Sequence, residues 1–349
     1  MVGLISFSKK IKDALIILVV GTFLGLLYPL LNGEDRLGPI LNGFVIGLTG
    51  SGLIVFNEII FNPKSLRLLK FKAVVIYKSI IYFTFFILII PLVVSLSRAI
   101  EQGISLSEFV DNRGLYRFIF EEDFHIIVFY ALVVTVLFIF TYQMSRKMGQ
   151  GVMWDFLSGK YFHPREEELI FMHLDLNDST SLAENLGDIE YNKFLKSFFF
   201  DITDSILNNY GKIYRYVGDE VVVTWKLKKG LKHTQFLNTF FEARKAIENN
   251  KEQYMDTYGV VPEFTVSFNF GKVIVGEIGE IKSQISFIGN VMYESRAIEK
   301  SCKKFNTDIL ISDTLLEKIE LPKKYKSQKV GRIEFLENSS VRVSSLSFA

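Results

Sequence analysis

The chain has 349 residues, of which 49% are hydrophobic, and a formal net charge of +2 at pH 7. This length favours two domains. A charge so close to zero gives no support to nucleic-acid binding, so we expect no nucleic-acid partner. The single cysteine, Cys302, excludes a disulfide within the chain. Most of the hydrophobic residues in excess of a soluble protein's share lie in the first 145 residues.

Four apolar stretches in this first part are long enough to cross a bilayer as helices, which takes about 20 residues each. They cover roughly residues 13–31, 39–61, 73–97 and 124–144. A cleaved signal peptide is not expected, because the first stretch lacks a small-residue cleavage site and the second follows it closely. Residues 1–145 are therefore predicted to form an all-α membrane domain of four transmembrane helices.

The charged residues that flank these stretches predict their orientation. Basic side chains precede the first stretch and fill the second connection: Lys9, Lys10, Lys12, Lys64, Arg67, Lys70 and Lys72. Arg146 and Lys147 follow the last stretch, whereas the loop from Arg98 to Asp123 is rich in Glu and Asp. The positive-inside rule then places both termini in the cytoplasm. We expect a multi-pass protein of the inner (plasma) membrane.

Two charged residues, Glu58 and Lys78, lie inside the predicted spans at similar depth. Two interpretations stay open: the side chains pair across an antiparallel helix hairpin, or both extend to the nearby interface. The sequence shows no matched repeats with broken helices of the kind that transporters use. The membrane domain is therefore predicted to be an anchor or a sensor.

Residues 146–168 contain glycines, Pro164 and a run of charges, which predicts an exposed connector. A second domain, 169–349, begins with a short apolar strand that ends at Asp175. Ser181 and Glu184 have capping-box spacing, which predicts a helix running from there to about Asn209. A hairpin, a helix at 234–258, further strands and a last helix and strand follow. This order predicts a ferredoxin-like α+β sandwich.

In such a sheet the end of the first strand lies beside the tip of the central hairpin, so Asp175 and Asp219 are expected to meet. Two converging carboxylates repel each other unless a divalent cation neutralises them, and oxygen ligands favour Mg²⁺ or Mn²⁺. The segment after Asp175 opens a helix whose free backbone amides suit a polyphosphate: Asn177, Asp178, Ser179, Thr180 and Ser181. These features predict phosphoryl or nucleotidyl chemistry with two metal ions. A plain two-residue turn at Gly218 and Asp219 is the alternative.

The sequence predicts no catalytic or metal-binding role for the other polar residues near Asp175 and Asp219. Glu220 is expected to be a solvated or structural neighbour of Asp219, and His173 to point out of the first strand. None of the four histidines pairs with another at a ligand spacing, so no histidine metal site is predicted.

Three stretches resemble the class III nucleotide cyclases, in particular the membrane-anchored bacterial type. They read FMHLDLNDSTSLAENLG, GKIYRYVGDEVVVTWKL, and FTVSFNFGKVIVGEIG with ISFIGN, and the resemblance covers about residues 150–335. It implies a cytosolic catalytic domain that works as a dimer and converts a nucleoside triphosphate, ATP foremost, to a 3′,5′-cyclic nucleotide and pyrophosphate. It also implies that Asp175, Asp219 and the backbone carbonyl of Leu176 hold two Mg²⁺ or Mn²⁺ ions.

The second half of the domain departs from the family pattern. The resemblance implies an Asn and, four residues later, an Arg on the helix after residue 290, but Tyr293 and Ala297 occupy these positions. Arg296 stands one residue out of register, which rotates it by about 100° around the helix. Four further positions also depart: Arg215 and Ser286 stand where base-selecting residues are expected, and Leu336 and Glu337 where a basic phosphate ligand is expected.

Three interpretations accommodate intact metal ligands beside missing partner groups. The chain is the metal-binding half of a heterodimer, or a homodimeric cyclase that uses Arg296 or Tyr293, or a non-catalytic receptor that binds nucleotide and metal. The sequence leaves all three open.

Overall fold

The structure is a computed structural model that describes residues 2–34, 36–60, 69–149, 151–336 and 339–348. The chain divides into two compact units, essentially residues 3–147 and 148–349. The predicted connector, 146–168, contains a short helix, α8 (Val152–Leu157), and the first residues of strand β1 (Arg165–Leu176).

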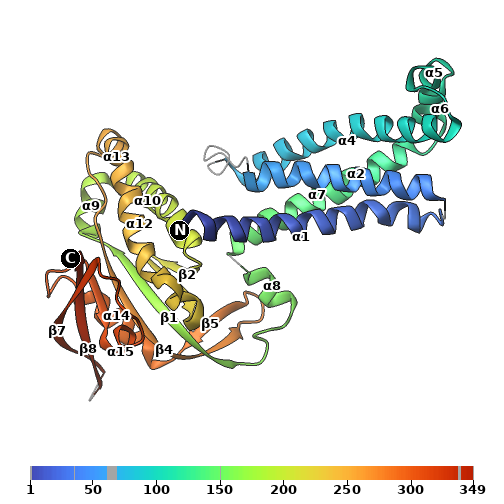
Figure 1. The fold of residues 1–349 in the computed structure, drawn as a ribbon. Helices are drawn as coiled ribbons and strands as arrows, with labels where there is room; N and C mark the ends of the chain where they lie inside the picture. The colour runs from blue at the N-terminus through green and yellow to red at the C-terminus, as the bar shows by residue number, and fades with distance from the viewer. Residues whose placement is uncertain (1, 35, 61–68, 150, 337–338, 349) are drawn as a thin grey trace. The chain divides into compact units, whose positions relative to one another are not determined.

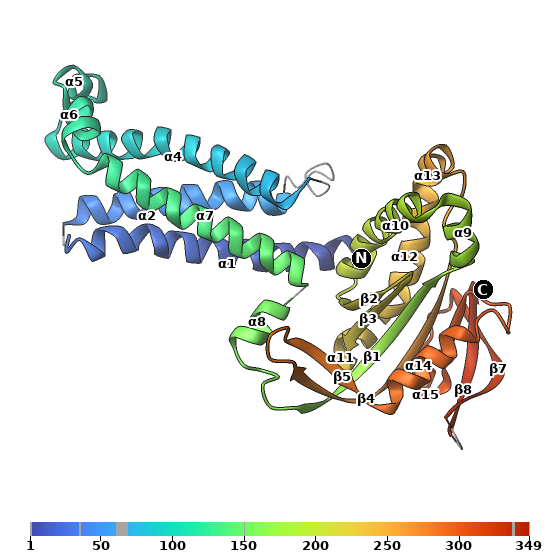
Figure 2. The ribbon, with the colours of Figure 1, turned by 180° about the vertical axis from the view of Figure 1, so that it is seen from behind.

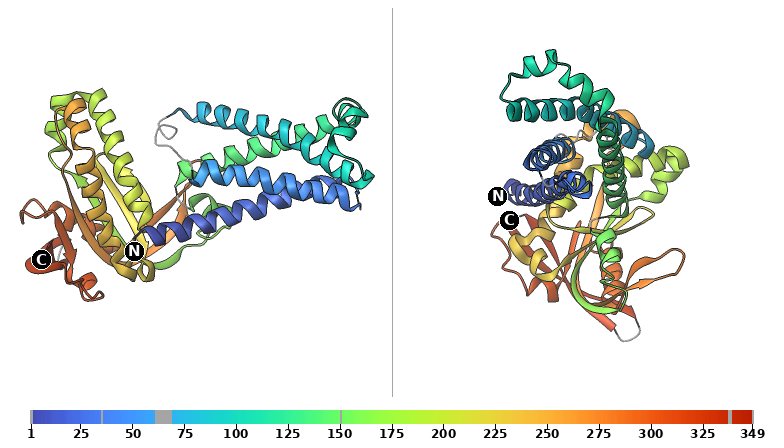
Figure 3. Two further views of the ribbon diagram at one scale, coloured as in Figure 1. Left: turned by 45° about the horizontal axis from the view of Figure 1, so that its top comes forward. Right: turned by 90° about the vertical axis from the view of Figure 1, so that its right-hand side faces the viewer.

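The N-terminal unit is built from four long helices that run alongside one another (Figure 1): α1 (Val2–Leu31), α2 (Leu37–Val55), α4 (Phe71–Gln102) and α7 (Phe124–Met148). Each of the four is long and apolar enough to cross a membrane. Two short helices, α5 (Leu106–Asp111) and α6 (Gly114–Glu121), lie together at one end (Figure 3). The predicted all-α unit with four helices of this length and apolar character is confirmed.

Small residues bring α1 and α2 into close contact. A Cβ atom added to Gly43 would lie 2.6 Å from the carbonyl oxygen of Gly25, and one added to Gly21 would lie 2.5 Å from the Cβ of Ser51. Glycine and serine at helix interfaces allow such close approach in a membrane, where helices associate largely through van der Waals packing.

The two charged residues of the predicted spans form an ion pair. Glu58 lies in a π-helical turn, η1 (Phe56–Ile60), that continues α2, and Lys78 lies on α4. The Lys78 ammonium donates to the Glu58 carboxylate, and the two side chains are 5% and 2% exposed, respectively. Of the two interpretations, the structure therefore shows the pair across a helix hairpin. A π-helical turn within a helix often marks a functional position.

The C-terminal unit contains one mixed sheet of eight strands in the order β2-β3-β1-β4-β6-β8-β7, with β5 paired to β4. The strands after β1 are β2 (Lys212–Val217), β3 (Glu220–Lys226), β4 (Phe264–Ile278), β5 (Gln284–Ile288), β6 (Ile309–Ser312), β7 (Tyr325–Leu336) and β8 (Ser339–Phe348). The central strand β1 is antiparallel to both β3 and β4. The first four strands have the ferredoxin-like arrangement, so the predicted α+β fold is confirmed.

Helices cover the two faces of this sheet. The helices of this unit are α9 (Ser179–Leu186), α10 (Asp188–Asn208), α11 (Leu227–Leu231), η2 (Lys232–Thr234), α12 (Gln235–Asn249), α13 (Lys251–Tyr258), α14 (Asn290–Lys300) and α15 (Asp313–Leu316). Helices α10 and α12 pack on one face and α14 packs on the other (Figure 2).

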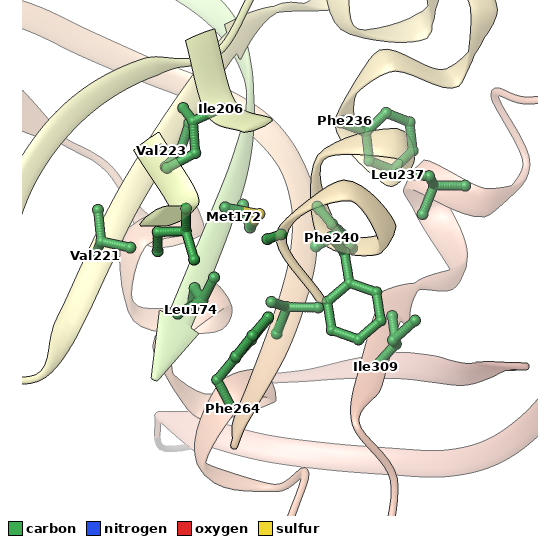
Figure 4. Close-up of a cluster of buried hydrophobic side chains, with 14 of the residues drawn as sticks. Met172, Leu174, Ile206, Val221, Val223, Phe236, Leu237, Phe240, Phe264 and Ile309 are labelled. Carbon is green, nitrogen blue, oxygen red and sulfur yellow. The ribbon is translucent and has the colours of Figure 1, made fainter. Parts of the chain in front are cut away.

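The alternation of side chains along β1 assigns its residues to these faces. Met172 and Leu174 point into the main core, where Phe236 and Phe240 of α12 meet them (Figure 4). Phe171 points to the opposite face, toward Val291 of α14. The same alternation places His173 and Asp175 on the α14 face, away from the main core.

The predicted start of the first long helix is wrong. Asp178 takes a left-handed conformation, with φ of 51°, and precedes α9, which starts at Ser179. Ser181 is therefore inside the first turn and cannot act as the cap of a capping box. The single predicted helix is also two helices, because the chain turns at Gly187, where φ is 75°. The helix predicted at 234–258 is likewise divided, into α12 and α13.

Candidate functional site

Asp175 lies near the end of β1, directly beside the β2–β3 turn. Leu174 pairs with Val221 of β3, so the two residues that follow Leu174 reach the hairpin tip. Val217 pairs with Glu220, which leaves Gly218 and Asp219 as a two-residue turn, and Gly218 has the positive φ of 64° that such a turn favours. The hairpin is present, and it lies where the topology predicts.

The electrostatic environment of Asp175 shows that carboxylates converge here. Burial raises the pKa of Asp175, and the negative charges of Asp219 and Glu220 raise it further, to about 6. Asp175 is partly buried, and burial is the largest cause of its raised pKa, followed by the charge of Asp219. Asp175 and Asp219, which are 44 residues apart in the sequence, are thus brought together as the topology predicts.

Glu220 and His173 hold the hairpin against β1. Nδ1 of His173, a side chain that is 2% exposed, hydrogen-bonds the Glu220 carboxylate. Burial alone would raise the pKa of Glu220, but the hydrogen bond and charge of His173 lower it. Of the two expectations for Glu220, a solvated position is wrong and a structural partner is what the structure shows. His173 does point out of the main core, but α14 covers that face.

Glu299 is a buried acid that sequence reasoning missed. It lies on α14, is 8% exposed, and faces the same carboxylates. Burial raises the pKa of Glu299, and the charges of Asp175 and Glu220 raise it further, to about 7. Its helical spacing from the apolar residues Val291 and Ile298, which are also buried, is the sequence signal that could have found it.

Glu299→Gln is expected to stabilise the fold at pH 8 by about 1 kcal/mol, because a neutral amide replaces an acid that is costly to ionise. The folded-state pKa lies above the ordinary value of 4.5. The cost in the parent chain is therefore absent below about pH 4.5, grows up to about pH 7 and is complete above it. Apparent melting temperatures of the full chain in EDTA at pH 5 and pH 8 measure the difference. The exposed acid Glu252 gives the control, Glu252→Gln. A gain for Glu299→Gln that is equal at both pH values would contradict this account.

Two basic residues partly offset this negative charge. After burial and the acidic neighbours, Lys303 and Arg296 act in the opposite direction and lower the pKa of Asp175. Nζ of Lys303 lies 3.4 Å from Oδ1 of Asp178. Arg296 also helps to lower the pKa of Glu220, after the larger effects of burial and His173. Arg296 itself is an exposed residue of α14.

The predicted phosphate-binding amides are only partly free. The amide of Asn177 donates to the carbonyl of Glu263 over 2.8 Å, so this part of the prediction is wrong. The pairing of β1 with β4 simply continues one residue beyond Leu176. Within α9 the amide of Leu182 donates to the carbonyl of Asp178, over 3.0 Å. The earlier amides, Ser179 to Ser181, belong to the first helical turn, where no intrahelical acceptor exists.

The backbone of Leu176 has the orientation that the predicted metal site needs. Successive backbone groups of a strand point to opposite sides. Since the amide of Asn177 faces β4, the carbonyl of Leu176 faces β3 and the turn that carries Asp219. The buried side-chain oxygen of Asn177 also has no hydrogen-bond partner among the described residues.

These donors fit a divalent cation. Carboxylates with surplus negative charge and a carbonyl oxygen are the hard ligands that Mg²⁺ and Mn²⁺ prefer. No three His, Cys, Asp or Glu side chains in the described ranges are placed to hold a metal together. An ion here would therefore depend on the two aspartates and the carbonyl, and would keep open positions for phosphate oxygens.

No family model matches the chain, but two other comparisons find similar proteins. Adenylate cyclase 2 of Rhizobium meliloti (strain 1021) is 30% identical over 208 residues, which are 60% of this chain and 57% of that protein. A bacterial light-regulated adenylyl cyclase superposes with a TM-score of 0.52 at 14% identity, over 62% of this chain and 64% of its own. The C-terminal unit has the fold of a class III nucleotide cyclase domain. The chain spans little more than half the length of the curated relative.

Two of the remaining predicted positions lie on β5 and α14 of the C-terminal unit. Ser286 of β5 pairs with Gly276. That position is at the other end of β4 from Thr265, the partner of Asp175. Tyr293 is 61% exposed on α14. Ser286 is therefore remote from Asp175 along β4, and the Tyr293 side chain is directed to solvent.

Arg215 lies on β2 of the C-terminal unit. It follows a bulge in β2, and its guanidinium lies 5.2 Å from the ring centre of Tyr214. Its charge makes a smaller contribution to the lowered pKa of Glu220, after burial, His173 and Arg296. Of the predicted basic phosphate position, Leu336 ends β7, and Glu337 lies outside the described residues.

Proposed function

We propose that this chain is a membrane-anchored nucleotide cyclase that converts a nucleoside triphosphate to a 3′,5′-cyclic nucleotide and pyrophosphate. The observation that carries the proposal is the convergence of Asp175 and Asp219 at the edge of a class III cyclase fold. ATP is the favoured substrate, because the curated relative is named an adenylate cyclase.

In this proposal Asp175, Asp219 and the carbonyl of Leu176 hold two Mg²⁺ or Mn²⁺ ions. Such ions favour the ionised ribose 3′-oxygen and neutralise charge on the phosphates. The first-turn amides, Ser179 to Ser181, bind phosphate oxygens, as helix N-termini do. The bond from the 3′-oxygen to the α-phosphorus forms, the bond from that phosphorus to the bridging oxygen of the β-phosphate breaks, and the hydroxyl proton passes to solvent.

The chain's own residues supply positioning rather than a nucleophile. The His173–Glu220 pair fixes the hairpin that carries Asp219, so both aspartates keep one separation. Holding the 3′-oxygen in line with the α-phosphorus lowers the barrier by removing the entropy cost of alignment.

We further propose that the chain acts in a dimer as the metal-binding half of a heterodimer. Two positions support this: Tyr293 and Ala297 replace the expected Asn and Arg. The same replacements support a second candidate, a non-catalytic receptor that binds nucleotide and metal.

Turnover by the purified full chain tests the proposal. The chain in lipid nanodiscs is incubated with Mn²⁺ and ATP, GTP, CTP or UTP, and the products are separated by chromatography. A cyclic product from one of the four supports a cyclase and excludes the half-enzyme. Nucleotide binding without turnover would support either a half-enzyme that needs a partner chain or a non-catalytic receptor. The absence of both binding and turnover would contradict the proposal.

We also propose that both termini of the membrane domain lie in the cytoplasm. Reporter fusions after residues 35 and 110 are expected to be external, and fusions after residues 68 and 150 cytoplasmic, because the basic flanks lie on the cytoplasmic side. Paired alkaline phosphatase and fluorescent protein fusions measure this. A cytoplasmic reporter at residue 110 would be inconsistent with four spans.

A further inference from the structure

The N-terminal unit encloses a cavity of about 540 Å³ between α1, α2, α4, α6 and α7. Small-molecule sites in proteins have volumes of roughly 300–1,000 Å³, so this cavity has the size of a ligand site. Its interior is apolar and is lined by side chains such as Ile54, Phe86 and Phe138. It lies wholly within the membrane unit and is independent of the carboxylates of the cyclase domain.

One end of the cavity is strongly charged. Six charged residues line it where α1, α4 and α6 end and α2 and α7 begin: Glu34, Arg36, Arg98, Glu101, Glu122 and Asp123. Arg36 pairs with Glu34 at 2.9 Å and Arg98 with Glu122 at 2.6 Å. In the part of the chain that the structure describes, Glu101 and Asp123 form no ion pair. This end therefore carries more carboxylates than guanidiniums.

Two tyrosines stand beside these carboxylates. The rings of Tyr28 and Tyr130, whose centres are 5.4 Å apart, both line the cavity. The hydroxyl of Tyr130 donates to the carbonyl of Leu24 over 2.8 Å, which fixes its ring. Asp123 lines the same cavity as the two rings. Aromatic faces next to carboxylates form a favourable environment for an ammonium group.

A polar group deeper in the cavity has no partner of its own. Thr135 of α7 is 4% exposed and lines the cavity, and its hydroxyl makes no hydrogen bond within the described ranges. Buried hydroxyls in proteins are nearly always hydrogen-bonded. The nearby hydroxyl of Ser51, by contrast, donates to the carbonyl of Gly47 over 2.7 Å. Thr135 is thus available to a ligand.

We propose that this cavity binds a small cationic amphiphile, with an ammonium head between Glu101, Asp123 and Tyr28 and an apolar body that extends toward Ile54 and Phe86. An anionic head would meet the surplus carboxylates, and a neutral head would gain nothing from them. The negative charge of the lining therefore favours a cationic head group, and the apolar interior favours an apolar chain.

Binding of radiolabelled decyltrimethylammonium to the full chain, purified in a neutral maltoside detergent, tests this proposal. We expect saturable binding that unlabelled decyltrimethylammonium displaces. Decanol and decyl sulfate have the same chain length, and we expect each to compete at least about tenfold less well, as unequal charge contacts imply. Because this comparison uses the unaltered chain, it does not depend on the folding of any variant.

A pair of variants assigns the selectivity to the cavity. Glu101→Gln with Asp123→Asn is expected to weaken binding about tenfold. Glu108→Gln with Asp111→Asn removes the same charge from α5, outside the cavity lining, and is expected to leave binding unchanged. Melting temperatures of both variants establish that each is folded.

Three results would overturn the proposal. The first is equal competition by the three head groups, or no saturable binding. The second is an equal loss in the control variant, which would mean that charge near the cavity acts non-specifically. The third is displacement of the probe by added phosphatidylethanolamine as effectively as by decyltrimethylammonium itself, which would assign the cavity to a bilayer lipid.

Discussion

Asp175→Asn and Asp219→Asn are each expected to lower cyclic nucleotide formation by at least about 100-fold, because each removes a charged ligand from the metal ions. The measurement is the rate of product formation by the full chain with ATP and Mn²⁺, or by the full chain together with a complementing partner if it is inactive alone.

Asp188→Asn is the matched control for this prediction. It makes the same chemical change at an exposed acid on α10 and should leave the rate unchanged. The Asp175→Asn chain should melt no lower than the parent at neutral pH, because burial and then the charges of Asp219 and Glu220 raise the pKa of Asp175 to about 6. Full activity in both site variants would contradict this prediction and would mean that Asp219 is a plain turn residue.

Restoring the missing partner groups is expected to produce the second large effect. Tyr293→Asn with Ala297→Arg should raise turnover by the chain alone by about 100-fold or more, if each restored group contributes what one preorganised transition-state donor contributes. Initial rates with saturating Mn²⁺ and ATP measure the gain. Tyr293→Gln with Ala297→Leu is the control, because it changes the same positions without restoring the groups.

Mixing experiments test the same complementarity without altering this chain. A homologous cyclase domain whose two metal aspartates are removed should regain activity on mixing with this chain, because the chain supplies the metal half. A homologous domain that keeps its aspartates but lacks its Asn and Arg should gain nothing. If no partner is complemented and the restored variant stays inactive with metal bound, the non-catalytic receptor becomes the better account.

Features that depend on local pattern could be predicted from the sequence. The four long helices follow from continuous apolar runs of the length that a membrane-crossing helix needs. The alternation in β1 assigns Met172 and Leu174 to the core and Asp175 to the other face. The order of elements fixes the neighbours of β1, and with them the meeting of Asp175 and Asp219.

Features that depend on contacts between distant elements could not be predicted in this way. Whether the Asn177 amide is free depends on Glu263, which lies 86 residues further along the chain. The hydrogen bond between His173 and Glu220 depends on strand register to a single residue. The left-handed conformation of Asp178 moved the start of α9, and a capping-box spacing does not reveal it.

The cavity of the N-terminal unit also depends on contacts between distant elements, so the sequence does not predict it. Each of its helices shows an ordinary apolar pattern, and nothing in one helix indicates a space between them. The surplus of carboxylates becomes meaningful only when the ends of α1 and α4 and the start of α7 lie around one opening. The sequence does predict an acidic loop at 98–123, which is the part of the signal that it contains.

Direct measurement of Mn²⁺ binding tests the paired-carboxylate site without depending on turnover. The full chain is titrated with Mn²⁺ in the presence of 3′-deoxy-ATP, which cannot be cyclised, and bound Mn²⁺ is followed by electron paramagnetic resonance. We expect nucleotide-dependent Mn²⁺ binding to the parent chain and to Asp188→Asn, and its loss in Asp175→Asn and Asp219→Asn. Unchanged nucleotide-dependent binding in both site variants would contradict the assignment of Asp175 and Asp219 as the metal ligands.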